Sequence, residues 1–201
     1  MNRVTLSLSK SLVALSLLLT CTVAARAADV TWQADPIHST ATFTATHLGI
    51  SHVTGIIPIE SASLEIPEGS NIPSSATAAL DPTGIDTRFG MRDNDLKSAH
   101  FFDIATYPAM GFKSTKIVPT DATHFTMTGD LTMHGQTHPV TLTCEYLGRM
   151  TDSRGHQHIG YTGKATIDRT QWGMTYGAIV ASNSIDLEID IEAIAKTQDR
   201  E

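Results

Sequence analysis

Cysteine, aromatic residues and long apolar runs are all scarce in this sequence. Two of its 201 residues are cysteine, Cys21 and Cys144, and aromatic residues make up 6% of the chain. The longest apolar run, from Leu12 to Leu19, is well short of the roughly 20 residues that a membrane-spanning helix needs. We therefore expect no transmembrane segment, and a packed core in place of a disulfide framework.

Runs of basic residues are missing as well. The formal net charge of the chain is −7, and Lys and Arg are scattered along it. Nucleic acids and anionic membrane surfaces attract clustered positive charge, which this composition does not supply. We therefore expect no nucleic-acid partner.

The sequence also lacks the short motifs that accompany common catalytic sites. It contains no G-x-S-x-G elbow, no phosphate-binding P-loop and no H-E-x-x-H pair. His38 and Ser39 are adjacent in a predicted strand, so their side chains point to opposite faces and cannot act as base and nucleophile. These absences predict that the protein is not an enzyme and that it has no cofactor.

The first 27 residues have the layout of a secretory signal peptide. Arg3 and Lys10 precede the short apolar run, and Ala25-Arg26-Ala27 supplies small residues at a cleavage site after Ala27. We expect a periplasmic protein made of a single domain, residues 28–201. Its net charge is −10, from 11 basic and 21 acidic residues. A lipoprotein acylated on Cys21 is a rival interpretation, which the preceding Thr20 disfavours.

Period-two alternation dominates the remaining chain and predicts β-strands with one buried face. In the last strand, Ile185, Leu187 and Ile189 alternate with acidic residues. Short connections favour antiparallel pairing. Asp93 is expected to cap a short helical insert over 90–103. The eight expected strands cover residues 30–47, 51–66, 74–86, 107–119, 122–134, 136–149, 156–168 and 183–195.

The small residues on the predicted inward face bear on what fills the interior. Glycine or alanine stands at inward positions such as Ala41, Gly129 and Gly163, and Cys144 is expected there as a small buried hydrophobe. Such residues leave space inside an eight-stranded barrel, which is about the size that holds one small ligand. Facing aromatic side chains that fill those gaps remain the alternative.

Three segments carry a resemblance to the YceI-like family of exported lipid-binding proteins. The similarity extends over about residues 30–194, and Arg169 with Trp172-Gly173 fits it too. In place of a Phe-rich stretch the chain has Ile56-Ile57-Pro58-Ile59, so its lining is less aromatic there. The three segments contain Asp35-Pro36-Ile37-His38-Ser39, Ile85-Asp86-Thr87 with Arg92-Asp93 and Phe101-Phe102-Asp103, and Gly129-Asp130-Leu131-Thr132-Met133-His134-Gly135.

The resemblance implies an all-β fold: an elongated, lipocalin-like, eight-stranded antiparallel barrel around an apolar pore. Members of the family bind polyisoprenoid chains such as isoprenoid quinones, and some bind fatty acids or their amides. The implied function is periplasmic binding, transport or storage of such a lipid, and a homodimer is compatible with it. The alternative is an exported stress-linked or metal-binding module without a lipid cargo.

Apolar side chains predicted to face inward are the candidates for contact with such a lipid. Aromatic rings supply contact area, and methionines adapt to an irregular chain. For each residue alone, ordinary core packing explains the position equally well. The candidates are Phe43, Phe101, Phe102, Phe112, Met127, Met133 and Tyr161.

Three basic residues near the insert are the candidates for contact with a head group. Arg88, Arg92 and Lys97 could bind a pyrophosphate, although pairing of Arg92 with Asp93 or Asp103 is an alternative role. The acidic net charge favours a neutral quinone or amide head over an anionic one.

The nine histidines raise the question of a metal site. His156 and His158 lie two apart on a predicted strand, and two further pairs flank turns: His134 with His138, and His47 with His52. No cysteine or carboxylate joins any pair at a typical ligand spacing. We therefore predict no metal site from the sequence.

Overall fold

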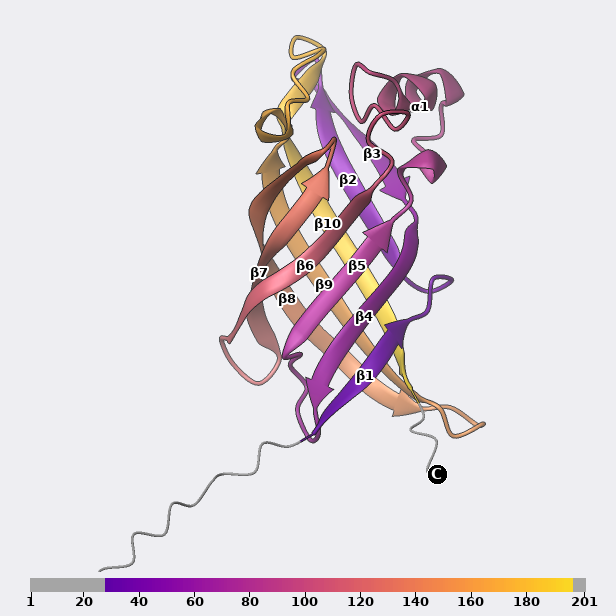
Figure 1. Cartoon of the computed structure of the whole chain (residues 1–201), viewed down its shortest axis with the longest axis vertical. Helices are drawn as coiled ribbons and strands as arrows, with labels where there is room; N and C mark the ends of the chain where they lie inside the picture. The colour runs from indigo at the N-terminus through magenta and orange to yellow at the C-terminus, as the bar shows by residue number, and fades with distance from the viewer. Residues whose placement is uncertain (1–27, 197–201) are drawn as a thin grey trace, which may run out of the picture.

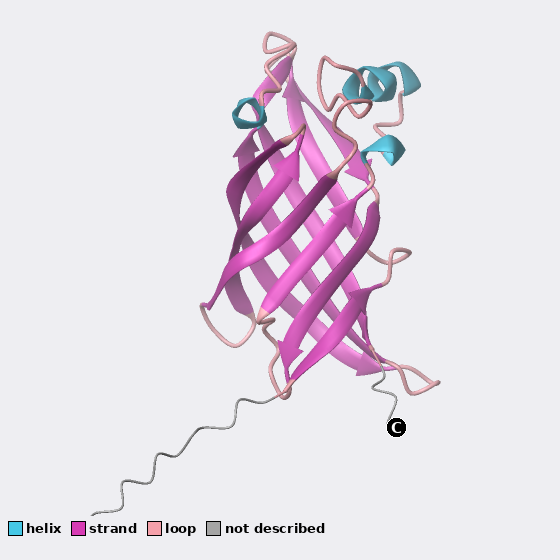
Figure 2. Cartoon of the chain, in the orientation of Figure 1, coloured by secondary structure: helices cyan, strands magenta, loops and turns pink. Residues whose placement is uncertain are grey.

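The computed structural model describes residues 28–196, so the predicted signal peptide lies outside the described residues. This part of the chain is almost entirely β-structure, with one short α-helix and two 3₁₀ turns (Figures 1 and 2). It contains no helix that is long and apolar enough to cross a membrane. The elements are β1 (Asp29–Ala34), β2 (Thr40–His47), β3 (Ser51–Ile57), β4 (Ile59–Pro67), β5 (Ser75–Leu80), η1 (Pro82–Gly84), α1 (Gly90–Lys97), β6 (Met110–Pro119), β7 (His124–Met133), β8 (Gln136–Thr151), β9 (Gln157–Asp168), η2 (Arg169–Trp172) and β10 (Ala181–Ala195).

The strands form a closed antiparallel barrel. Hydrogen bonding runs from β1 through β4 and then in sequence order from β5 to β10, and β10 pairs back with β1. The extra segments β2 and β3 extend the wall above β1 and β4 (Figure 1). Counting each interrupted strand once gives eight, and the predicted eight-stranded barrel is confirmed.

Proline explains why the first two predicted strands are interrupted. The strand expected over 30–47 breaks at Pro36, where the Asp35 carboxylate accepts the Ile37 N–H at 2.9 Å and holds a turn. The strand expected over 51–66 breaks at Pro58, between β3 and β4. Proline has no N–H to donate to a ladder, so the continuous strands predicted here were wrong at these points.

Strand β10 joins three neighbours and closes the barrel. One edge pairs with β9 along eleven residues, from Ser184 to Ile194. The other edge pairs with β2 from Ala181 to Asp190 and then with β1 through only three pairs, Trp32–Ala195, Gln33–Ile194 and Ala34–Ala193. The β1–β10 contact is therefore the shortest ladder in the closed circuit.

The helical insert is present but shorter than expected. Helix α1 begins after Phe89, its N-cap, and ends at Lys97, so the prediction that Asp93 is the cap was wrong. Asp93 lies in the first turn, where its carboxylate accepts hydrogen bonds from both the backbone N–H and the hydroxyl of Thr87. None of the helix residues is buried.

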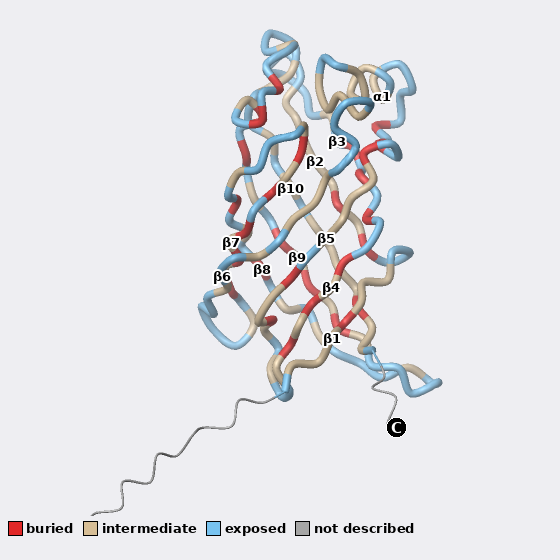
Figure 3. Tube along the Cα trace, viewed as in Figure 1, coloured by how far each residue is buried: buried red, intermediate tan, exposed pale blue. Residues whose placement is uncertain are grey.

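The lower part of the barrel contains a packed core. Trp32, Ile66, Phe125, Ile159 and Tyr161 form one buried cluster between β1, β4, β7 and β9. Along β7 and β9, buried positions alternate with partly or fully exposed ones (Figure 3), as the period-two pattern predicts.

Cys144 lies within this cluster and is a free thiol. Its burial raises the pKa of the thiol to about 12. It therefore stays protonated near neutral pH and acts as a small buried hydrophobe, as predicted.

Turn aspartates make the fold sensitive to acid. Hydrogen bonds to Thr83, Thr123 and Thr170 lower the pKa values of Asp81, Asp121 and Asp168 respectively. A lowered pKa in the folded state contributes stability above the unfolded pKa of about 3.9, which is lost as pH falls through the folded values.

We predict that the urea midpoint falls as the pH drops below about 4. Asp121→Asn keeps an acceptor oxygen without a titrating group, so it should flatten part of that fall. Chemical unfolding across this pH range measures both effects. A midpoint that does not change between pH 5 and pH 2.5 would contradict the assignment.

Candidate functional site

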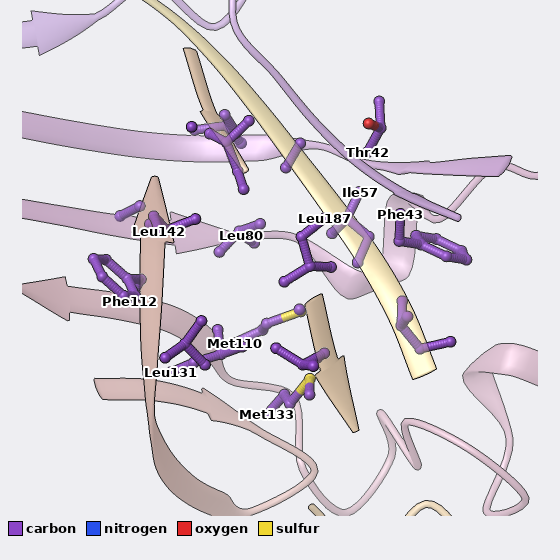
Figure 4. A pocket seen from close by; sticks show the side chains of 18 of the residues that line it. Thr42, Phe43, Ile57, Leu80, Met110, Phe112, Leu131, Met133, Leu142 and Leu187 are labelled. Carbon is purple, nitrogen blue, oxygen red and sulfur yellow. The ribbon is translucent and has the colours of Figure 1, made fainter. Parts of the chain in front are cut away.

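A cavity of about 460 Å³ lies inside the barrel above the packed core. Side chains from β2, β3, β5, β6, β7, β8 and β10 converge on it (Figure 4). The wall is almost wholly apolar, and it includes Ala41, Ile57, Leu80, Met110, Leu131 and Leu187.

All seven side chains predicted from the sequence to contact a ligand border this cavity. Phe43 comes from β2, Phe112 from β6, and Met127 and Met133 from β7. Their contact with a ligand stays a prediction. The remaining three are Tyr161 on β9 and Phe101 and Phe102 after α1.

Two of the inward glycines are covered by aromatic rings. A Cβ atom on Gly129 would lie 2.3 Å from the Phe112 ring, and one on Gly55 would lie 2.4 Å from the Phe43 ring. Gly129 therefore leaves no void, and the alternative of filled gaps holds there. A Cβ on Gly163 would meet its nearest neighbour at an ordinary 3.4 Å, so this glycine does leave space.

Tyr161 marks the floor of the cavity, where the packed core begins. Its hydroxyl donates to the Asn71 carbonyl at 2.8 Å, and its ring packs edge-on against Phe125. Burial raises the pKa of this phenol, so it remains neutral at physiological pH. The ring can present an apolar face to a ligand while its polar end is already satisfied.

The upper end of the cavity is covered by two loops that touch each other. The segment after α1 contributes His100 and Phe101, and the loop between η2 and β10 contributes Tyr176. The His100 and Tyr176 rings stack with centroids 4.0 Å apart, and Phe101 meets Tyr176 edge-on at 5.7 Å. The insert and this loop therefore form a roof over the apolar interior.

Only one of the three predicted head-group residues borders the cavity. Arg92 lines it, and its guanidinium donates to the hydroxyl and carbonyl oxygens of Thr87 at 2.7 and 2.8 Å. Arg92 therefore stabilises the insert through hydrogen bonds to Thr87. The alternative role, in which Arg92 pairs with Asp93 or Asp103, is not what the structure shows. Arg88 is exposed, and neither it nor Lys97 lines the cavity.

Arg169 is a polar residue of the cavity wall to which the sequence pattern assigned no role. It is 4% exposed, and it donates to the carbonyl oxygens of Ser182, Met174 and Ala181 at 3.0, 2.7 and 3.2 Å. Desolvation lowers its pKa. Its guanidinium also lies 5.5 Å from the Phe101 ring, so it ties the two roof loops together. The sequence did contain one signal for Arg169, because it matches the family pattern together with Trp172-Gly173.

Two of the histidine pairs predicted from spacing approach one shared residue each: Asp152 lies near His156 and His158, and Trp172 near His134 and His138. His134 Nδ1 lies 2.6 Å from the Trp172 carbonyl, and His156 Nδ1 lies 3.1 Å from Asp152. His158 also contacts Glu192 at 2.8 Å. β9 begins at Gln157, after His156, so the strand alone does not align the pair, but both imidazoles approach the Asp152 carboxylate, at 3.1 and 3.6 Å.

A closed antiparallel barrel with an apolar internal cavity defines a lipocalin-like binding fold. Residues 32–193 match the YceI-like domain, which is most of the described chain. The protein therefore belongs to the YceI-like family, as the resemblance indicated.

Relatives and solved structures agree with this membership. A UPF0312 protein of Vibrio cholerae is 29% identical over 92% of this chain and 96% of its own length, and one of Enterobacter is 30% identical over 90% and 94%. The crystal structure of a Campylobacter jejuni YceI protein is 28% identical, with a TM-score of 0.67 over 76% of this chain and 90% of that one. A polyisoprenoid binding domain from Saccharophagus degradans shares the fold at 15% identity, with a TM-score of 0.58 over 83% and 99%.

Filling the cavity from Gly163 should abolish uptake of apolar molecules. Gly163→Phe projects a ring into the open interior, whereas Thr143→Phe places the same ring on the exposed face of the neighbouring strand β8. We predict that fluorescence titration with an apolar naphthylamine dye shows at least about tenfold weaker binding for Gly163→Phe alone, because the ring occupies the binding volume. Equal binding by a folded Gly163→Phe protein would contradict this cavity assignment.

Proposed function

We propose that the barrel binds one long apolar lipid of the isoprenoid type, a quinone or polyprenyl chain, in its internal cavity. The enclosed apolar wall carries this proposal. The volume of about 460 Å³ falls within the range of roughly 300–1,000 Å³ that is typical of ligand pockets. Each Å² of apolar lipid surface removed from water contributes about 25 cal/mol, so a hydrocarbon chain gains most from such an enclosure.

The chemistry of the wall supports binding without catalysis. The buried Cys144 thiol and Tyr161 phenol both have raised pKa values, so neither is an ionised nucleophile at neutral pH. Arg92 and Arg169 are held by oxygen atoms of the protein itself. A stress-linked module without cargo, the alternative function, would leave this apolar space without an occupant.

The free hydrogen-bond donors of Arg169 favour a lipid whose head group accepts hydrogen bonds. Three of the five N–H groups of a guanidinium are used here, which leaves two for a ligand. A quinone or amide carbonyl can accept them without adding a net charge to a strongly acidic protein. A fatty acid or amide would fit the same chemistry and is a second cargo class.

Titration with matched lipids tests the proposed cargo. We expect an isoprenoid quinone to bind about tenfold or more tightly than a prenyl pyrophosphate with the same chain, because the two arginines that line the cavity, Arg92 and Arg169, are both engaged with oxygen atoms of the protein. A fatty amide should fall between them. Displacement of a bound apolar naphthylamine dye gives the affinities of all three lipids on one scale. Preferential binding of the pyrophosphate would overturn the neutral head group, and binding of none of the three would overturn the lipid proposal.

We further propose that the protein acts in the periplasm and exchanges its cargo with membranes through the roofed end. Large apolar side chains are exposed there on three separate segments. Ile50 is 85% exposed, Met91 74% and Ile179 92%. The Leu48 N–H donates to the Val180 carbonyl at 3.0 Å, so two of these loops lie side by side above the barrel wall (Figure 1). Exposed apolar patches of this kind mark interaction surfaces.

Charge is absent from the same two loops. Residues 47–59 and 170–185 contain no Asp, Glu, Lys or Arg, in a chain with 21 acidic residues. A loop that enters the apolar boundary of a bilayer must leave ionised groups behind, because their desolvation is costly. The uncharged loops are therefore suited to an uncharged hydrocarbon boundary and not to an anionic surface.

Substitutions in these loops should slow lipid transfer without changing lipid affinity. Ile50→Ser with Ile179→Ser removes two exposed apolar contacts, and we expect transfer of a fluorescent quinone between phosphatidylcholine vesicles to slow at least about tenfold, since burial of each side chain can contribute roughly 1.5 kcal/mol or more. Ile37→Ser is the matched control, because Ile37 is 84% exposed on the turn between β1 and β2. Equal slowing by Ile37→Ser, or no slowing in the double variant, would refute the proposed contact of these loops with the membrane.

A further inference from the structure

The turn between β1 and β2 brings a histidine and a carboxylate against the outside of β10. Asp35 and His38 belong to this turn, and the Asp35 N–H donates to the Glu192 carbonyl at 2.8 Å. The Glu192 side chain points outward from β10, and the inward neighbour Ala193 is fully buried. Glu192 is more than 150 positions from Asp35 and His38 in the sequence, but the three residues share one patch of the outer wall.

The donor atoms of this patch are close enough to hold one metal ion. One ligand atom each from Asp35, His38 and Glu192 can be chosen so that all lie within 4.8 Å of one another. Donors around a tetrahedral zinc ion lie roughly 3.3 Å apart, given bond lengths of about 2.0–2.2 Å. His38 Nδ1 already lies 2.9 Å from Asp35 Oδ2, and the His38 side chain is 59% exposed, so small side-chain rotations suffice to bring the donors to the separation that zinc needs.

A second imidazole holds Glu192 in place. His158 on β9 lies with its Nδ1 atom 2.8 Å from Glu192 Oε1, and its Nε2 atom is buried without a hydrogen-bond partner, 3.6 Å from Asp152. Partners of this kind orient the ligands of metal sites. His38, His158 and Glu192 also border one surface depression, which is separate from the internal cavity.

The neighbouring cation is directed away from this patch. Arg149 borders the same depression, but its guanidinium donates to the Ser70 carbonyl at 3.0 Å and lies 5.1 Å from the Trp32 ring. It therefore does not neutralise the two carboxylates. Imidazole nitrogen with carboxylate oxygen is a donor set that suits zinc.

We infer that Asp35, His38 and Glu192 form a zinc site on the outer wall of the barrel, with His158 positioning Glu192. The site would connect the turn after β1 to β10. This is where the barrel closes through only three residue pairs, so bound zinc would strengthen the shortest ladder of the circuit. The inference does not depend on the lipid cargo.

Zinc titration of the untagged, chelator-treated protein tests the site. We expect one zinc ion per chain by calorimetry and elemental analysis, and about tenfold or greater loss of affinity in both His38→Ala and Glu192→Gln. His124→Ala is the matched control, because it removes an exposed imidazole that pairs with one carboxylate, Asp121, at 3.0 Å. The control should bind zinc like the parent.

Two further readouts keep the result unambiguous. Circular dichroism checks that each variant is folded, and the exposed His38 side chain can be removed without exposing the core. Zinc should also slow hydrogen exchange in residues 193–195, which pair with β1. The inference is overturned by the absence of stoichiometric zinc, or by parent-like zinc affinity in both His38→Ala and Glu192→Gln.

Discussion

The closure of one antiparallel sheet by β10 is the constraint on which the rest of the structure depends. Because β10 pairs with β9 on one edge and with β2 and β1 on the other, the sheet has an inside that no open sheet would have. Period-two alternation then places apolar side chains there and acidic ones outside. The barrel can stay hollow above its packed lower core because its backbone hydrogen bonds are satisfied within the wall and do not require a filled centre.

What occupies the interior depends on which side chain lies opposite each small inward residue. Gly55 and Gly129 admit the rings of Phe43 and Phe112, whereas Gly163 opens space. The result is neither a solid core nor an empty tube. Trp32, Phe125 and Tyr161 fill the lower end, and an apolar cavity remains between them and the roof. Such an arrangement suits a chain-like apolar ligand that enters from the roofed end.

The alternating strands, their number and the inward residues could be predicted from the sequence, because period two reports directly which face is buried. The strand breaks at Pro36 and Pro58 could also have been predicted, because proline has no N–H to donate to a ladder. The location of Arg92 against Thr87 and the role of Arg169 could not be predicted, because both depend on loops that meet only after the barrel closes. The same holds for Asp35, His38 and Glu192, which no sequence spacing joins. Of the pairs that spacing did join, His156 and His158 approach the same carboxylate, Asp152, which the sequence did not indicate as their partner.

We propose that the internal cavity is a lipid-binding site. The most direct measurement is solvent extraction of the protein purified from its native compartment without detergent, followed by mass spectrometry of the extract. The account predicts close to one long apolar lipid per chain, of the isoprenoid type and with a neutral head group. A native protein with no extractable lipid, which also takes up none from vesicles, would contradict it.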